Sequence, residues 1–164
     1  MPDALSSFAV IKKVDVRWGD MDAFNHVNNV VYIQYFETVR VAHLLHLKNH
    51  VPADSSFDAA AFMEGPTSSS AGVGPILAST SCKYLFPVQY PDELLVGSKV
   101  ERIDGDRFFM KYAVWSTTLE RLCAVGDGLV VTYDYETQSK CPVPPALASA
   151  IDLQQQIGPE ILIR

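Results

Sequence analysis

Residues 17–37, RWGDMDAFNHVNNVVYIQYFE, place two acids, a histidine and three asparagines directly ahead of a long apolar run. Val31, Tyr35 and Val39 recur at helical spacing in that run, which contains no Gly or Pro and predicts a helix over about 29–48. Asn28 or Asn29 is the expected N-cap, because a short side-chain acceptor satisfies amides of the first turn. The polar cluster therefore lies at the helix amino end, where unpaired amides and the positive end of the dipole gather.

The rest of the chain has the texture of β-structure. Residues 9–18 alternate in part, and four runs rich in β-branched and aromatic residues follow Pro75, at 76–86, 93–103, 107–118 and 121–135. The short turns between these runs imply antiparallel neighbours. We predict an α+β fold: one long central helix wrapped by a curved antiparallel sheet of about five strands, then a short C-terminal helix over 146–157.

The totals favour a cytoplasmic globular protein. Its 164 residues predict a single domain, 1–164, with a long loop at 49–74 and a C-terminal extension at 146–164. A net charge of -6 argues against nucleic acid or an anionic membrane as partner. No apolar run is long enough to span a membrane, the amino terminus does not resemble a secretory signal, and the three cysteines have no paired spacing.

The order of elements and the opening stretch together resemble the hot-dog fold, and more narrowly the acyl-CoA thioesterases of the 4-hydroxybenzoyl-CoA thioesterase class. Members of that class show a similar D-x-D-x-x-x-H-V-N-N-x-x-Y-x-x-Y-x-E-x-x-R pattern. The matching residues here are Arg17, Trp18, Asp20, Asp22, His26, Val27, Asn28, Asn29, Tyr32, Tyr35, Phe36, Glu37 and Arg40. The resemblance implies hydrolysis of an acyl-CoA, with no cofactor and no metal. It also implies a homodimer or homotetramer with active sites between subunits.

The resemblance aligns Asp22 with the family's catalytic carboxylate, as nucleophile or as the base that activates water, and leaves Asp20 as a turn residue. His26 is expected to hydrogen-bond substrate or the loop. Related plant acyl-carrier-protein thioesterases have asparagine two residues after the aspartate; here Phe24 stands there, and Asn25 is a supporting residue.

Substrate contacts are expected from the start of the helix and from basic strand residues. Val27, Asn28 and Tyr32 are the expected contacts near the thioester. Arg107 is the best candidate for the ligand's phosphates, since related enzymes have basic residues at this strand, with Lys83 and Lys111 behind it.

Four other interpretations stay open. The polar cluster could be only an Asx-rich turn with an N-cap. The chain could be a hot-dog hydratase or dehydratase acting on enoyl or 3-hydroxyacyl thioesters, or an acyl-thioester-binding protein without activity. His43, His46 and His50 are spaced to share a helical face and could ligate a metal, but no acid or cysteine completes the set. Histidines near a helix end also favour the dipole, so charge facing solvent is the simpler interpretation.

Overall fold

The computed structural model describes residues 1–52, 54–55, 57–64 and 72–162. Its helices are α1 (Asn29–His46), α2 (Ala59–Glu64) and α3 (Pro145–Ile157), with three short 3-10 helices, η1 (Asp3–Leu5), η2 (Trp18–Asp20) and η3 (Leu47–Asn49). The long helix and the C-terminal helix agree with prediction. Among the described helices, none has the length and apolar character needed to cross a bilayer.

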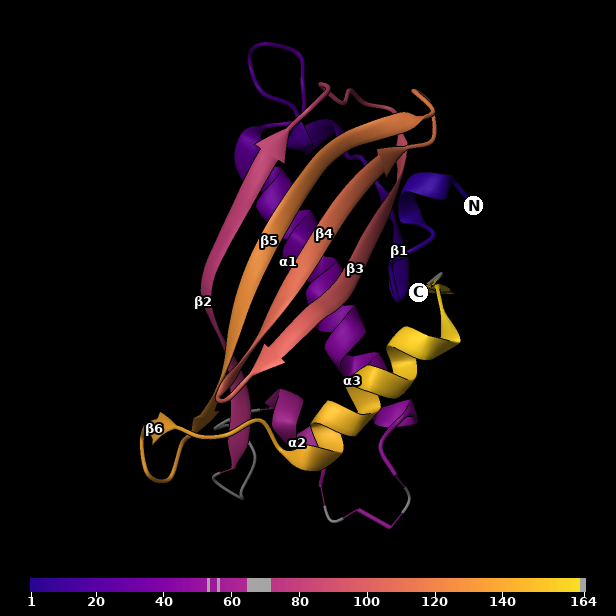
Figure 1. Ribbon diagram of the computed structural model, residues 1–164. Coiled ribbons are helices and arrows are strands. Elements are labelled where there is room, and N and C mark those ends of the chain that lie inside the picture. The colour runs from indigo at the N-terminus through magenta and orange to yellow at the C-terminus, as the bar shows by residue number, and fades with distance from the viewer. Residues whose placement is uncertain (53, 56, 65–71, 163–164) are drawn as a thin grey trace.

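The strands form one curved sheet that is antiparallel except at one edge (Figure 1). They are β1 (Val10–Asp15), β2 (Val73–Tyr84), β3 (Glu93–Asp104), β4 (Arg107–Ser116), β5 (Arg121–Asp134), β6 (Ser139–Lys140) and β7 (Glu160–Leu162). Their order is β2-β5-β4-β3-β1-β7, and β6 pairs with β5. The prediction of about five strands missed β6 and β7, which are too short to leave a periodic pattern. β7 pairs parallel with β1, at the edge opposite β2.

Helix α1 runs along the inner face of the sheet and supplies much of the core (Figure 1). Its buried side chains include Tyr32, Tyr35, Phe36 and Val39. A glycine on β5 makes close contact possible: a Cβ on Gly126 would lie 2.4 Å from Cε2 of Phe36. The helix and sheet are therefore packed at a separation that the sequence of β5 sets.

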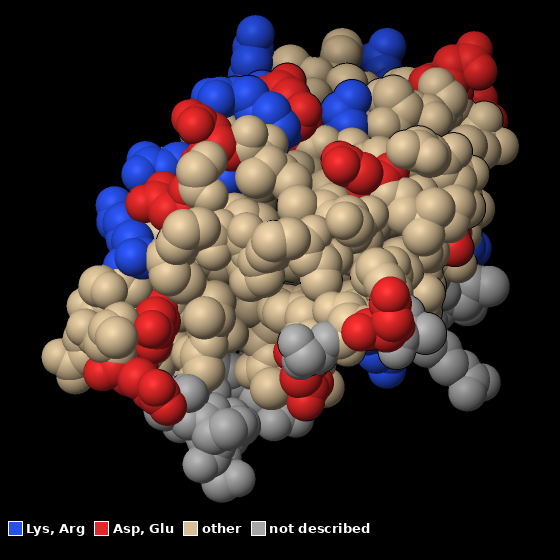
Figure 2. Space-filling view, turned by 60° about the horizontal axis from the view of Figure 1, so that its bottom comes forward, with Lys and Arg blue, Asp and Glu red and all other residues tan. Residues whose placement is uncertain are grey.

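The outer face of the sheet is only partly covered. Leu5 and Phe8, from η1 and the residues after it, pack there with Ile11 and Ala113 in a second, smaller core. Figure 2 shows the lower face of the molecule, where Lys and Arg gather mainly along one edge among acidic residues. That face offers no continuous basic surface of the kind that nucleic acid requires.

Candidate active site

The polar cluster folds into a tight turn directly ahead of helix α1. An isolated antiparallel bridge between Met21 and Val27 closes this turn. The amide of Asp22 donates to the carbonyl of His26 at 2.9 Å, and Asn25 takes a positive φ of 63° to close the turn. Asp22 Oδ1 accepts from the amide of Phe24 at 2.8 Å, so the Asx turn proposed as the structural alternative is present. Asp22 Oδ2 makes no hydrogen bond to the described residues and is free to meet a ligand.

Asp20, two residues earlier, is only 4% exposed and is held through both carboxylate oxygens. Its Oδ2 accepts from the Arg17 amide at 2.9 Å and from the Tyr35 hydroxyl at 3.0 Å. Arg17 also forms an ion pair with Oδ1 at 3.2 Å. Burial, together with the Asp20 carboxylate, raises the pKa of Tyr35 above its ordinary value. Asp20 is thus a buried structural acid at the start of the turn, where a turn residue was expected.

A cavity of about 390 Å³ opens beside Asp22. Its lining residues are Asp22, Phe24, His26, Val27, Asn29, Tyr32, Tyr84, Leu85, Phe86 and Pro87. The volume is in the range of small-molecule sites. The turn, the start of α1 and the end of β2 therefore meet at one place. Of the predicted site residues, Asp22, His26, Val27 and Tyr32 line this cavity, and Asn25, Asn28, Lys83 and Arg107 do not.

The amides at the helix start are only partly available. Val27 N–H donates to the carbonyl of Val88 at 2.8 Å, and Asn28 N–H donates to that of Asp20 at 2.9 Å. The Asn28 side chain caps Val30 N at 3.1 Å, which confirms the N-cap. The backbone amide of Asn29 makes no hydrogen bond to the described residues, and Asn29 lines the cavity. The backbone amides of Val27 and Asn28 are therefore not available to a substrate oxygen, and substrate contact through other atoms of these two residues stays a prediction.

Two tyrosines form the inner wall. Tyr32 is buried, which raises its pKa to about 12, and its ring packs edge-on against Tyr84 with centroids 5.2 Å apart. The Tyr84 hydroxyl donates to the carbonyl of Asn29 at 3.0 Å and ties β2 to the helix start. Sequence reasoning missed Tyr84, Leu85 and Phe86. The sequence feature that could have identified them is a run of three large apolar residues at the end of a strand, just before Pro87. All three are exposed in the structure.

The predicted phosphate-binding residues do not meet Asp22 within one chain. Arg107 aligns through β5 with Ile76 of β2, eight residues from Tyr84, or roughly 26 Å along the strand. It pairs with Asp106 at 2.6 Å. Lys83 is exposed and does not line the cavity.

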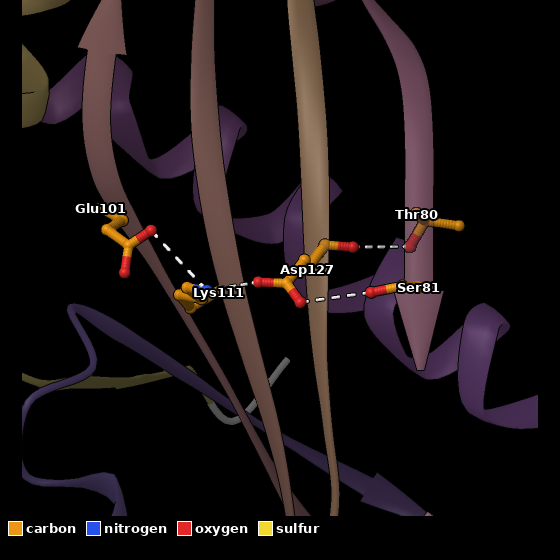
Figure 3. Close-up of polar contacts among 5 residues, drawn as sticks. All are labelled: Thr80, Ser81, Glu101, Lys111 and Asp127. Carbon is orange, nitrogen blue, oxygen red and sulfur yellow. Dashed lines mark hydrogen bonds and ion pairs between the residues drawn. The ribbon is translucent and has the colours of Figure 1, made fainter. Parts of the chain in front are cut away.

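Lys111 lies on the sheet face away from α1, between Asp127 at 2.5 Å and Glu101 at 3.7 Å (Figure 3). The hydrogen bond with Asp127 raises the pKa of Lys111, and Ser81 also donates to Asp127 at 3.2 Å. Lys111 therefore forms ion pairs with neighbouring strands, and its ammonium group is not free to bind the phosphates of a ligand.

The comparisons with known proteins agree with this architecture. A thioesterase from Thermus thermophilus, solved with coenzyme A and zinc, superposes with a TM-score of 0.70 at 24% identity, covering 92% of this chain and 96% of that one. A DHNA-CoA thioesterase from Staphylococcus aureus gives 0.69 at 16% identity, covering 90% and 93%. A 1,4-dihydroxy-2-naphthoyl-CoA thioesterase from Synechocystis gives 0.65 at 18%, covering 87% and 94%. The fold is thus the hot-dog fold of thioesterases.

The chain belongs to the thioesterase-like superfamily, whose family model matches residues 16–151. A Bacillus subtilis (strain 168) relative named uncharacterized protein YsmA is 27% identical over 107 residues. That match spans 65% of this chain and 61% of the relative. The family resemblance expected from the turn and helix is therefore confirmed.

Proposed function

We propose that the protein hydrolyses acyl-CoA thioesters to free acid and coenzyme A. The observation that carries the proposal is the pairing of a free carboxylate oxygen, Asp22 Oδ2, with an unbonded helix-start amide, Asn29 N–H, at one cavity. Thioester hydrolysis needs an oxygen delivered to the carbonyl carbon and a donor for the developing oxyanion. Both groups are present, and membership of the thioesterase-like superfamily favours that reaction.

The reaction can follow either of two routes through Asp22. As a nucleophile, the carboxylate attacks the carbonyl carbon, the C–S bond breaks, the CoA thiolate leaves and takes a proton, and water then hydrolyses the mixed anhydride. As a general base, Asp22 takes a proton from water as the water oxygen attacks the carbonyl carbon. The C–S bond then breaks, and the CoA thiolate leaves and takes up that proton. In both routes the Asn29 amide and the helix dipole hold the carbonyl oxygen.

His26 and Asn25 have supporting roles in this proposal. His26 lines the cavity and its backbone closes the turn that presents Asp22. Asn25 is exposed and adopts the left-handed backbone conformation that asparagine tolerates, so it shapes the turn. Tyr32 forms the wall beneath the acyl group.

We further propose that a second copy completes the site. β2 is an edge strand of the sheet that the described residues form, and the exposed Tyr84, Leu85 and Phe86 lie at its end beside the cavity. Two β2 strands paired antiparallel would protect these edges. Such pairing reverses one strand relative to the other, which carries Arg107 of the second copy toward the cavity of the first. The phosphate-binding role of Arg107 then belongs to a homodimer, or to a homotetramer built from it.

The cellular location proposed is the cytoplasm. Cys82, Cys123 and Cys141 are free thiols in the structure. A reducing compartment keeps such thiols free.

Two other functions are retained as rivals. A hydratase or dehydratase would add or remove water at the C2–C3 bond of an acyl thioester, leaving the thioester intact. A binding protein would hold the ligand without turnover. The cavity is compatible with each, because hydration also needs a base and a donor for the enolate oxygen. Membership of the thioesterase-like superfamily is what favours hydrolysis.

The test is a panel of short, long and aromatic acyl-CoAs together with one enoyl-CoA. Free thiol is measured with a chromogenic disulfide, and enoyl-CoA hydration by loss of the conjugated double bond's absorbance. Thiol release supports the proposal, and the best acyl group identifies the substrate class. Hydration without thiol release would assign the chain to the rival enzyme class, and binding without either would assign it to the binding proteins.

A further inference from the structure

Two histidines at the carboxyl end of α1 meet a glutamate from the last strand of the chain. His46 is the last residue of α1, His50 follows η3, and Glu160 begins β7. Their ligand atoms, the two imidazole nitrogens and a carboxylate oxygen, all lie within 4.8 Å of one another. The sequence offered histidines at metal-binding spacing without an acid, and the C-terminal strand supplies that acid.

Several polar atoms of this cluster are buried and lack a hydrogen bond of ordinary geometry. The His50 side chain is only 8% exposed. Within the described residues, the buried side-chain nitrogens and oxygens of this kind are His43 Nε2, His46 Nε2, His50 Nε2, Gln154 Nε2 and Oε1, and Glu160 Oε2. All come from this end of α1 and the C-terminal elements packed against it. His46 Nε2 and Glu160 Oε2 are in ion-pair contact with each other, which leaves His50 Nε2, 3.8 Å from that oxygen, as the ring nitrogen of the cluster without a close partner. Buried nitrogens and oxygens without a hydrogen bond are rare in folded proteins, so their concentration around His50 points to a missing partner.

We propose that His46, His50 and Glu160 bind a divalent transition-metal ion, with zinc as the best fit. Two imidazoles and one carboxylate form a ligand set typical of zinc, leaving a fourth position for water. The spacing of four residues brings both rings to one side of the helix end, with centroids 5.4 Å apart. The cysteines take no part, so the site is distinct from thiolate zinc centres.

Asn49 faces the other nitrogen of the His46 ring. Its Nδ2 lies 3.3 Å from His46 Nδ1. Exchange of the carboxamide nitrogen and oxygen would let Asn49 accept the Nδ1 proton and leave Nε2 as the metal-binding nitrogen, the arrangement that commonly orients metal-binding histidines.

A bound ion would fasten the C-terminal strand to the central helix. β7 pairs with β1 over only three residue pairs, Val10 with Glu160 through Lys12 with Leu162. The Glu160 amide also donates to the carbonyl of Ala9 at 3.0 Å. Ligation through Glu160 would therefore hold a short edge strand whose own ladder is small.

The competing explanation is a metal-free ion pair. His46 Nε2 and Glu160 Oε2 are in ion-pair contact, and His50 Nε2 lies 3.8 Å from the same oxygen. One protonated histidine would satisfy part of the carboxylate. It would leave the second imidazole nitrogen, on His50, without a partner, which is why a shared ion accounts for more of the cluster.

The experiment uses tag-free full-length protein stripped with EDTA and dialysed into chelator-free buffer. Zn²⁺ is titrated calorimetrically, Co²⁺ is followed by its visible d–d absorption, and thermal melting is recorded with and without Zn²⁺. We expect one ion per chain, an imidazole–carboxylate cobalt spectrum and a higher melting temperature with metal. Glu160→Gln and His50→Gln should each weaken Zn²⁺ binding by about 10- to 100-fold and abolish the thermal shift.

Two controls separate the site from adventitious binding. Glu136→Gln removes an exposed carboxylate from a turn, and His26→Gln removes the histidine at the opposite end of α1; both should bind Zn²⁺ as the wild type does. Melting of each variant in EDTA establishes that it folds. Absence of stoichiometric binding by the wild type, or unchanged affinity in both Glu160→Gln and His50→Gln, overturns the proposal and leaves the ion pair. The readouts are independent of thioesterase activity.

Discussion

The Tyr35 hydroxyl donates to Asp20 Oδ2 over 3.0 Å inside the core, whereas Asp22, two residues on, keeps its own Oδ2 unbonded to the described residues beside the cavity. The same turn thus contains one structural acid and one acid available to a substrate. The distinction depends on α1, because Tyr35 lies roughly one and a half turns into that helix. Substitution of Asp20 should therefore lower stability, whereas substitution of Asp22 should lower activity.

Tyr35→Phe should lower stability without removing the proposed catalyst. The change deletes a hydrogen bond to a buried carboxylate, which contributes about 1.5–3 kcal/mol. We expect a fall of that size in the free energy of unfolding by urea. Thiol release per folded molecule should change little, and unaltered stability would contradict the structural role of Asp20.

Gly126→Ala should destabilise the protein by about 1–3 kcal/mol, because the new methyl would clash with Phe36 and with the Ser81 carbonyl, 2.5 Å away. Gly19→Ala is the matched control. No atom lies within 4 Å of a Cβ at that position, so its effect should stay within about 0.5 kcal/mol. Urea denaturation compares the two, and equal effects would mean that α1 does not pack against β5 as described.

His43 should make the protein less stable in weak acid. Its ring is fully buried, with Nδ1 2.7 Å from Ser98 Oγ, and burial, assisted by neighbouring His46, lowers its pKa from 6.5 to about 4. Between pH 6.5 and about 4, His43 is therefore protonated in the unfolded chain but not in the folded chain. The free energy of unfolding should fall as the pH drops from about 6.5 to about 4, by about 3 kcal/mol from this group.

The measurement is urea denaturation across that pH range in EDTA, which keeps metal from the nearby cluster. In His43→Gln the free energy of unfolding should fall less over this pH range than in the wild type. In His26→Gln it should fall as much as in the wild type. A His43→Gln curve parallel to that of the wild type would rule out His43 as the source of the slope.

The β2 edge should mediate self-association. Leu77 is 38% exposed on this strand, and Leu77→Lys should shift the sedimenting mass from a multiple of 18.1 kDa to a single chain. Leu153→Lys, at a similarly exposed leucine on α3, is the control and should leave the mass unchanged. If the wild type itself sediments as a single chain, the two-copy site is wrong.

The sequence predicted the parts of the fold that have a local signal. The helix, its Asn28 cap and the four long strands follow from periodicity and turn chemistry, and the boundaries agree within a few residues. The motif also brought Asp22 and His26 to one cavity. β7 could not be predicted, because three residues give no period and its pairing with β1 joins opposite ends of the chain.

Long-range pairing likewise decides which groups are available at the site. The amides of Val27 and Asn28 donate to the carbonyls of Val88 and Asp20, and the sequence alone gives no sign of these contacts. Arg107 was separated from Asp22 by the length of the strands. Arg40, three residues after Glu37 on the helix, shows the same dependence on the fold: among the described residues it donates to the Tyr112 hydroxyl at 3.4 Å and forms no ion pair with Glu37.

The most direct test of the account is thiol release from the best acyl-CoA by wild type, Asp22→Asn and Asp20→Asn, each normalised to folded protein. Asparagine at position 22 can still accept the Phe24 amide, so the turn is kept while the carboxylate is lost. We predict that Asp22→Asn lowers kcat by about 10²–10⁴-fold with a near-normal melting temperature, whereas Asp20→Asn mainly lowers stability. Full activity in Asp22→Asn would contradict the central claim and direct the search for the catalyst to His26 or Asp20.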